Sequence, residues 1–343
     1  MKTRRILGTA SLAALAMAMA GGARAADKYV VGVSNTLTGN GWREEMICSI
    51  KAQAEASGKV SKVVVANRNG GPSEQIADIR NLISAGANII IINPSDREAL
   101  NPVIKQAADK GIVVVAVDQA VTAPEAYVLT NDQVEYAKVG AKWLFDKLGG
   151  KGSVVEMRGI DGVPADADRH KGFDEVLKDY PNIKVTSSVF SGWAQNKTAE
   201  EMKDLLASGK EINGIWTSGI DATVVDAYKT AGKPFVPVVG ADNNGFIGQL
   251  IDMKAQGLTG AAVSNPPAVG AAGLGLALDV LEKKQVPHVV KITPTAWDNV
   301  KDVAELKKAY NSKLDPYYSD KIDIPPYTSF TMDQLIACKG PAS

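Results

Sequence analysis

The sequence predicts an α/β fold of two doubly wound αβα lobes, each built on a parallel sheet. Apolar β-branched runs alternate with amphipathic helical patterns through most of the 343 residues, and this alternation runs through the chain twice. In each half, one of the later predicted strands is followed directly by an aspartate. The two segments are IVVVAVD at 112–118 and PVVGAD at 237–242. Two lobes of similar plan, each near the common size of a domain, fit this length.

Residues 89–119 form the clearest strand–helix–strand unit. Four consecutive isoleucines, 89–92, stop at Asn93-Pro94, an amphipathic stretch covers 99–108, and Gly111 precedes a second apolar run at 112–117. A continuous β-branched run is typical of a strand that is buried on both faces of a parallel sheet. The crossover between two such strands is right-handed by default. Polar residues after these strands therefore lie at the edge where open α/β sheets bind ligands.

The same alternation predicts the remaining elements in order. Strands are expected at 29–34, 62–67, 127–130, 153–157, 184–190, 214–217, 236–240, 258–264 and 289–293. Helices are expected at 41–57, 73–84, 134–148, 168–178, 198–206, 222–231, 246–255 and 269–281. The stretch 294–343 is richer in Pro, Tyr and Lys and shows no clear strand period, so we expect a mostly irregular extension with one helix around 303–310.

Composition excludes several classes of function. Apolar content of 45% and charged content of 22% are those of a globular protein, and 38 basic residues balance 38 acidic ones, which gives no electrostatic case for a nucleic-acid partner. Two histidines and two cysteines, far apart, offer no metal-ligand cluster. No nucleophile elbow, phosphate-binding loop or HExxH pair is present. We therefore expect no cofactor, no metal and no enzymatic chemistry.

Residues 1–25 have the three parts of a secretory signal. Basic residues follow Met1, an apolar core covers 12–20, and Ala23-Arg24-Ala25 fits the small-x-small cleavage pattern. The core is too short for a transmembrane span, so export with cleavage after Ala25 is expected. The alternative is a disordered or anchored amino terminus. Export favours a disulfide between Cys48 and Cys338, and two unrelated buried thiols are the alternative.

Amide, carboxylate and aromatic side chains recur where the predicted strands end. Carboxylates and amides hydrogen-bond to hydroxyl groups, and indole faces offer flat contact to the C–H side of a sugar ring. The set therefore suits a neutral polyhydroxylated ligand, although each polar member could instead cap a helix or form a turn. The candidates are Asn40, Trp42, Arg43, Asp118, Gln119, Asn131, Trp193, Asp242, Asn243 and Asn265.

Five segments together resemble the periplasmic sugar-binding proteins of the ribose-binding type, which serve ABC transporters. They are VGVSNTLTGNGW at 31–42, IIINPSDREAL at 90–100, VVAVDQ at 114–119, VEMRGIDGVPADADRHKGF at 155–173 and VVGADN at 238–243. The resemblance implies two lobes joined by a three-crossover hinge, with ligand bound between them. It implies a first lobe of residues 26–131 plus 265–293, a second lobe of 132–264, and an extension, 294–343, without a counterpart in the ribose binder.

The resemblance also implies roles for single residues. Asn40 and Trp42 match an amide and an aromatic on the ligand, Asp118 matches a hydroxyl-binding aspartate, and Trp193 and Asp242 match an aromatic and an aspartate of the second lobe. The departures argue against ribose: Gln119 and Ala167 stand where the ribose binder has arginines, Arg43 replaces an aromatic, and Gly219, Ala241 and Ser264 replace an asparagine, a phenylalanine and a glutamine. Replacement contacts are expected from Asp166, Asp168, Asp221, Asn243 or Asn265.

The sequence thus predicts a monomeric periplasmic receptor that binds a small neutral sugar or polyol and docks on an ABC transporter permease without stable membrane insertion. A disulfide between Cys48 and Cys338 would clip the extension to the first lobe, clear of the cleft. Alternatives are a receptor for an autoinducer or a nucleoside, a repressor ligand domain, or a secreted carbohydrate-active enzyme with Asp118 and Asp242 as acid and base.

Overall fold

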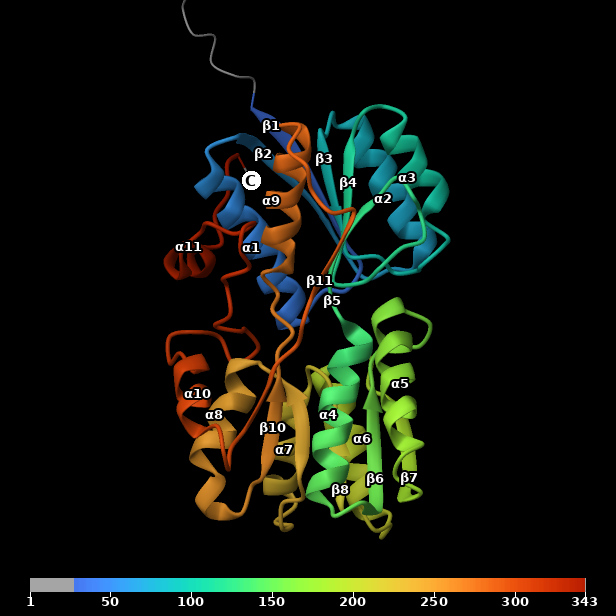
Figure 1. The fold of residues 1–343 in the computed structure, drawn as a ribbon, viewed down its shortest axis with the longest axis vertical. Helices are drawn as coiled ribbons and strands as arrows, with labels where there is room; N and C mark the ends of the chain where they lie inside the picture. Colours follow the sequence, from blue (N-terminus) through green and yellow to red (C-terminus); the bar gives the residue numbers. More distant parts are fainter. Residues whose placement is uncertain (1–27, 343) are drawn as a thin grey trace, which may run out of the picture.

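The computed structural model describes residues 28–342, which form two α/β lobes stacked along the long axis of the molecule (Figure 1). Each lobe contains one six-stranded sheet with helices on both of its faces. The predicted fold class is therefore confirmed. The predicted signal peptide, residues 1–25, lies outside the described residues.

The sheet of the first lobe is parallel throughout, with the strand order β11-β5-β4-β3-β1-β2. Its strands are β1 (Tyr29–Asn35), β2 (Val60–Asn67), β3 (Ile89–Ile92), β4 (Val113–Val117), β5 (Tyr127–Asn131) and β11 (Val289–Ile292). Helices α1 (Gly41–Ser57) and α9 (Val269–Leu281) cover one face, and α2 (Pro72–Ser84) and α3 (Asn101–Ala108) cover the other.

The four isoleucines of β3 show why this strand is apolar throughout. Ile89 and Ile91 pack into the core beneath α1 and α9, whereas Ile90 and Ile92 pack into the separate core beneath α2 and α3. All four side chains are buried. A central strand that is covered on both faces has no solvent side on which a polar residue could lie.

The sheet of the second lobe has the order β12-β10-β9-β8-β6-β7, with β12 antiparallel at one edge. Its strands are β6 (Lys151–Arg158), β7 (Asn182–Phe190), β8 (Gly214–Trp216), β9 (Val238–Ala241), β10 (Gly260–Val263) and β12 (Ala296–Asp298). Helices α4 (Gln133–Lys147) and α5 (Pro164–Leu177) cover one face. The other face is covered by α6 (Gln195–Ala207), α7 (Asp221–Thr230) and α8 (Asn244–Asp252), which the short 3₁₀ helix Lys254–Gln256 follows.

The chain passes between the lobes four times within the described residues. Three crossovers join β5 to α4, β10 to α9 and β11 to β12. After α10 (Val303–Ala309), which contacts α8 on the second lobe, the chain returns to the first lobe, where α11 (Met332–Ala337) contacts α1. The helix expected around 303–310 is present, but the stretch after residue 294 also contains β12 and α11. The sequence missed β12 because a three-residue edge strand is too short to show a period.

The predicted disulfide joins Cys48 in α1 to Cys338 at the end of α11, with 4.5 Å between the two Cα atoms. It fixes the end of the chain to the first lobe. On the return path, Ser319 hydrogen-bonds to Glu45 of the first lobe and to Asp242 of the second, so the extension also connects the two lobes.

Candidate ligand-binding site

A cavity lies between the two lobes and encloses about 420 Å³ of empty space, its mouth included. The part of this space that the centre of a water molecule can occupy is about 40 Å³, so the closed lobes leave a small cavity. Both lobes line it, with Leu37, Asn40, Trp42, Arg43 and Asp118 on one side, Ala165, Arg169, Trp193, Ser218, Gly219 and Ala241 on the other, and Asn265 at the hinge. The structure therefore brings Asn40, Trp42, Arg43, Asp118, Trp193 and Asn265 of the predicted set to one cavity.

The start of α1 positions three of these side chains. Asn40 caps the helix, since its Oδ1 accepts from the Arg43 N–H at 3.1 Å, and its Nδ2 donates across the cleft to the Trp193 carbonyl at 3.1 Å. The Trp42 indole Nε1 donates to the Asn265 carbonyl at 2.7 Å. The helix cap and the edge of the indole ring are thus fixed by the protein, which leaves the ring face of Trp42 for contact in the cavity.

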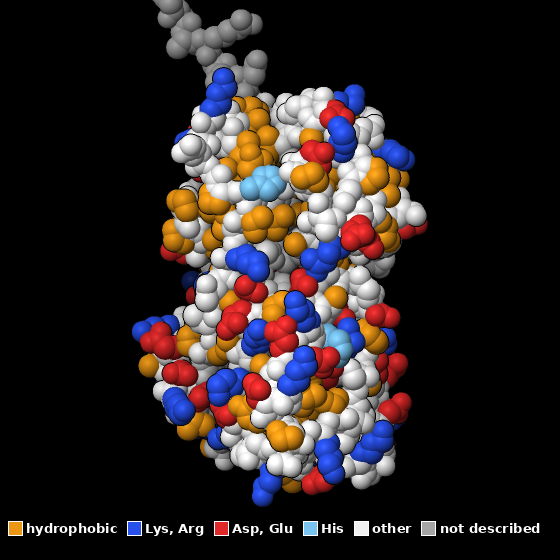
Figure 2. All heavy atoms as spheres, turned by 45° about the vertical axis from the view of Figure 1, so that its right-hand side comes forward, with side chains coloured by type: hydrophobic (Ala, Val, Ile, Leu, Met, Phe, Trp, Pro, Cys, Tyr) orange, Lys and Arg blue, Asp and Glu red, His pale blue; other side chains and the backbone are white. Residues whose placement is uncertain are grey.

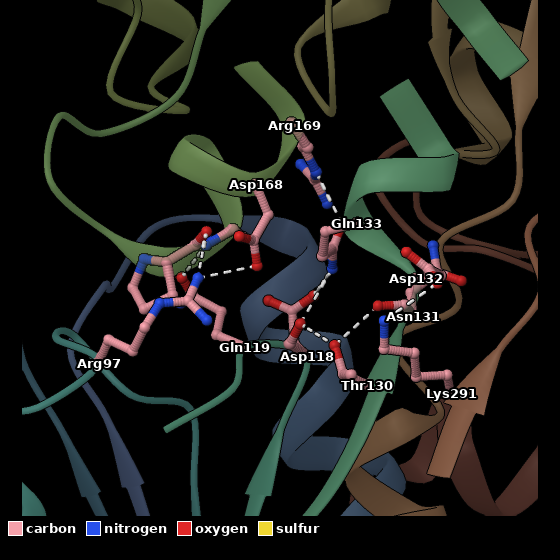
Figure 3. Close-up of polar contacts among 12 residues, drawn as sticks. Arg97, Asp118, Gln119, Thr130, Asn131, Asp132, Gln133, Asp168, Arg169 and Lys291 are labelled. Carbon is pink, nitrogen blue, oxygen red and sulfur yellow. Dashed lines mark hydrogen bonds and ion pairs between the residues drawn. The ribbon is translucent and has the colours of Figure 1, made fainter. Parts of the chain in front are cut away.

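Asp118 follows β4 and has a left-handed backbone, with φ of 65°. Its side chain is buried at 5% exposure. Oδ1 accepts from Gln133 Nε2 at 2.8 Å (Figure 3), and Oδ2 accepts from Asn93 Nδ2 at 3.3 Å. A carboxylate offers about four acceptor sites, so these two donors orient Asp118 and leave acceptor capacity on the cavity side.

Two arginines line the same cavity. Arg43 Nη1 donates to Asn35 Oδ1 at 3.1 Å, and burial lowers the pKa of Arg43 to about 10, an effect that nearby Asp118 opposes and Arg169 reinforces. Arg169 Nε donates to Gln133 Oε1 at 2.8 Å. Gln133 therefore connects Asp118 to Arg169 through its two amide atoms (Figure 3). Both guanidinium groups have further N–H donors that can serve ligand oxygens.

Sequence reasoning missed Arg169. It lies in the middle of α5 among charged residues, DADRHK, which is the pattern of a solvated helix face. One signal could have found it. Arg169 lies four residues after Ala165, so the two share a face of α5, and this helix begins shortly after a strand ends. Its guanidinium packs over the rings of Tyr136 and Trp193, at 4.6 and 5.7 Å from their centroids.

Trp193 is held on the second lobe by close packing. Its backbone is left-handed, with φ of 51°, and its Nε1 donates to Ser218 Oγ at 3.4 Å. A Cβ atom at Gly159 would lie 2.1 Å from the indole ring, so only glycine allows the ring to occupy this position. One indole from each lobe therefore lines the cavity, and indole rings offer flat apolar contact surface.

Seven candidate residues do not line the cavity: Gln119, Asn131, Asp166, Asp168, Asp221, Asp242 and Asn243. Protein groups bind at least one polar atom of each side chain. Gln119 Oε1 accepts from the Ala165 N–H at 2.8 Å, and Asn131 Nδ2 donates to the Ser264 carbonyl at 3.0 Å. Asp166 accepts from Arg158 and from the Gly159 N–H. Polar atoms of Asp242 and Asn243 also bind protein groups. Asp242 accepts from the Asn265 N–H and the Ser319 hydroxyl, and Asn243 caps α8.

The lobes contact each other directly at the rim of the cavity. Arg97 Nη2 of the first lobe lies 2.8 Å from Asp168 Oδ2 of the second, with about a third of each side chain exposed (Figure 3). Basic and acidic side chains are visible along the line where the lobes meet (Figure 2). At the hinge, Lys291 lies 3.2 Å from Asp132, the cap of α4. The structure thus has the lobes closed on one another.

Three carboxyl groups outside the cavity lining are buried: Glu45, Asp221 and Asp242. Burial raises the pKa of Asp221 to about 7 and raises the pKa of Glu45 and of Asp242. Among residues 28–342, no group of His, Cys, Asp and Glu side chains has the arrangement to hold a metal ion. The same residues contain no helix long and apolar enough to cross a membrane.

Residues 31–285 match the model of the periplasmic binding protein domain, so the chain belongs to this family. The relatives that it matches include proteins named for binding xylitol, ribose and galactofuranose. The chain is 32% identical over 243 residues to the xylitol-binding protein of Mycolicibacterium smegmatis, which covers 69% of this chain and 68% of that protein. It is 28% identical to the galactofuranose-binding protein YtfQ of Escherichia coli over 87% of this chain and 96% of that protein.

Solved structures agree with this assignment. An ABC transporter solute binding protein from Thermobispora bispora is 31% identical and superposes with a TM-score of 0.76, covering 85% of this chain and 90% of that one. The arabinose-binding component from Shewanella sp. ANA-3, bound to α- and β-L-arabinofuranose, is 25% identical with a TM-score of 0.73, covering 81% of this chain and 95% of that one.

Proposed function

We propose that this chain is a periplasmic receptor that closes over one small neutral sugar or polyol and delivers it to the permease of an ABC transporter. The observation that carries the proposal is the cavity between the lobes, which is lined by an indole from each lobe, Trp42 and Trp193, and by the buried carboxylate of Asp118. Indole faces pack against the C–H groups of a sugar or polyol, and the carboxylate accepts hydrogen bonds from its hydroxyl groups.

The ligand contacts in this proposal come from the residues that line the cavity. Arg43 and Arg169 donate to ligand oxygens, Asp118 accepts from hydroxyls, and Asn265 supplies a polar atom at the hinge. Small residues at Gly219 and Ala241 leave room on the second-lobe side. The relatives that bind xylitol and furanose sugars make pentitols and furanoses the first compounds to test.

The main test is a binding screen over pentoses, hexoses, furanose sugars and alditols, with thermal unfolding as the readout and titration calorimetry for each hit. A ligand that binds only the folded state stabilises it by about 2.7 kcal/mol at a hundredfold excess over Kd. The proposal predicts at least one compound with a saturable shift. A flat response to the whole panel contradicts it.

The enzyme alternative loses its geometric basis in this structure. The acid–base pair that it requires would join Asp118 to Asp242, but Asp242 does not line the cavity and both of its carboxylate oxygens accept hydrogen bonds at the hinge. Recovery of the ligand chemically unchanged after prolonged incubation, followed by NMR, separates the two functions. Conversion of the ligand would favour the enzyme.

The remaining parts of the proposal concern the exported form. We infer that the signal peptide is cleaved after Ala25, so that the mature chain begins at Ala26 and acts as a monomer in the periplasm. Intact mass of the protein from a periplasmic extract tests the cleavage site, and light scattering of the same sample tests the monomer. A mass that includes residues 1–25 would contradict the cleavage.

A further inference from the structure

We propose that residues 315–320, here called the C-terminal strap, act as a fourth connection between the lobes, and that Ser319 is a positioning residue for the hinge side of the ligand cavity. The strap lies on the return path of the chain from the second lobe to the first. Its effect on affinity rests on the function proposed above, whereas its effect on the hinge does not.

The strap is bound to the second lobe through the start of α8. The Pro316 carbonyl accepts from the Gly245 N–H at 2.6 Å, and the Tyr318 carbonyl accepts from the Asn244 N–H at 2.7 Å. The first N–H groups of a helix have no partner within the helix. The strap carbonyls therefore supply partners that α8 cannot supply itself.

The strap is bound to the first lobe along one face of α1. A Cβ atom at Gly41 would lie 2.3 Å from Tyr317 Cβ, so the strap lies directly against the first residue of the helix. Glu45 Oε2 accepts from the Ser319 N–H at 2.8 Å. Gly41, Glu45 and the disulfide residue Cys48 follow the spacing of one helix face, so the strap and the disulfide use the same side of α1.

Ser319 joins this attachment to the cavity through a chain of hydrogen bonds. Its hydroxyl donates to Asp242 Oδ2 at 3.1 Å, and Asp242 Oδ1 accepts from the Asn265 N–H at 2.8 Å. The Asn265 carbonyl in turn accepts from Trp42 Nε1 at 2.7 Å, and both of these residues line the cavity. Ser319, Asp242 and Glu45 are at most 3% exposed.

This geometry makes the strap part of the binding site's support. Without the Ser319 hydroxyl, Asp242 Oδ2 loses that donor in a buried position, where an unsatisfied acceptor is costly. Asp242 would then shift toward other donors, and the hydrogen bond that holds Asn265 would loosen. The hinge edge of the cavity would lose its fixed position even though no residue that lines the cavity has changed.

The test compares Ser319→Ala with Ser329→Ala. Ser329 is a matched control, because it also lies in the C-terminal stretch and its N–H and hydroxyl both bind Gln53 of α1, at 2.8 and 3.4 Å, without a second-lobe partner in the described chain. In the unliganded protein, Ser319→Ala should raise hydrogen exchange of the Asn265 amide about tenfold or more, whereas Ser329→Ala should leave it within about twofold.

The second readout is affinity for xylitol, or for the best compound of the screen. We expect Kd to rise about fivefold or more in Ser319→Ala and to stay within about twofold in Ser329→Ala, at similar urea midpoints for the two variants. If Ser319→Ala fails to fold, Ser319→Cys keeps the side-chain volume, replaces the hydroxyl with a weak donor and should give the same two effects in smaller measure.

The outcomes separate the strap from the proposed function. Wild-type exchange at Asn265 in a folded variant overturns the proposal for the strap, whether or not any ligand binds. Faster exchange with an unchanged Kd overturns the role of Ser319 in positioning the site. If no sugar or polyol binds the wild-type protein, the proposed function fails, and exchange at Asn265 still decides whether the strap holds the hinge.

Discussion

Replacing Asp118 with Asn should weaken ligand binding strongly while leaving the protein folded. Asp118 has a φ of 65°, a backbone conformation that asparagine adopts more readily than other non-glycine residues. The two side chains also have the same shape. The substitution therefore tests the carboxylate itself, whereas alanine at this position would add backbone strain.

The size of the effect follows from the two donors that already contact Asp118. Gln133 Nε2 and Asn93 Nδ2 both donate to this carboxylate. The NH₂ group of an asparagine at this position would therefore face one of these two donors or the hydroxyl groups of the ligand. In each case the ligand loses a charged acceptor in a buried site. Hydrogen bonds to charged groups contribute about 1.5–3 kcal/mol, so Kd should rise about 10- to 150-fold.

Calorimetric titration of wild type, Asp118→Asn and a control variant measures this effect. Asp78→Asn is the matched control, because Asp78 is also buried and accepts two hydrogen bonds from Arg68, but lies on α2 away from the cavity. The control should lower the urea midpoint and leave Kd unchanged. Binding by Asp118→Asn within about twofold of wild type would refute a ligand contact at this residue.

Three further predictions concern aromatic contact, the disulfide and pH. Trp193→Ala should weaken binding and remove part of the ligand-induced change in indole fluorescence; an unaltered change would exclude this ring from the site. Cys48→Ser with Cys338→Ser opens a link between residues 290 apart, and should lower Tm by removing up to about 5 kcal/mol; two free thiols in the denatured, unreduced wild type would contradict the disulfide. Burial raises the pKa of Asp221 from 3.8 to about 7, so the folded state binds the extra proton and this group's contribution to stability falls as pH rises from about 4 to 7. Asp221→Asn should flatten that part of the stability profile, and an unchanged slope in urea midpoints between pH 4 and 8 would contradict the assignment.

Much of the fold could be predicted because it depends on local patterns. The isoleucines of β3 must be apolar on both faces, and the alternation of strands and helices determines the parallel arrangement. Within the cavity, Trp42 and Asp118 were predictable because parallel strands end at one edge of their sheet. These inferences need no knowledge of distant contacts.

Long-range contacts explain what the sequence could not predict. Asp242 lies at the expected strand end, yet its Oδ2 accepts from Ser319, which is 77 residues further along the chain. Asn243 caps α8. Capping is the ordinary role of an asparagine at such a position, and the sequence alone does not distinguish it from ligand binding. Arg169 was missed for the opposite reason, since a charged helix segment gives no sign of which side chain turns into a closed cavity.

The direct contacts between the lobes indicate how ligand and closure are coupled. The Arg97–Asp168 pair is about one-third exposed and is worth about 0–1 kcal/mol. The hydrogen bonds from Asn40 to the Trp193 carbonyl and from the Ala165 N–H to Gln119 add about 1 kcal/mol each.

The hydrogen bond from Gln133 of α4 to Asp118 adds to these contacts, and their total of a few kcal/mol favours the closed arrangement. A ligand shifts the equilibrium only by its differential affinity for the two states. In the proposed function, Asp118 and Trp42 of one lobe bind the ligand before closure, whereas Trp193 and Arg169 of the other lobe contact it only when the lobes meet. The second pair should therefore determine how far binding drives closure, and the first pair should determine whether the ligand binds at all.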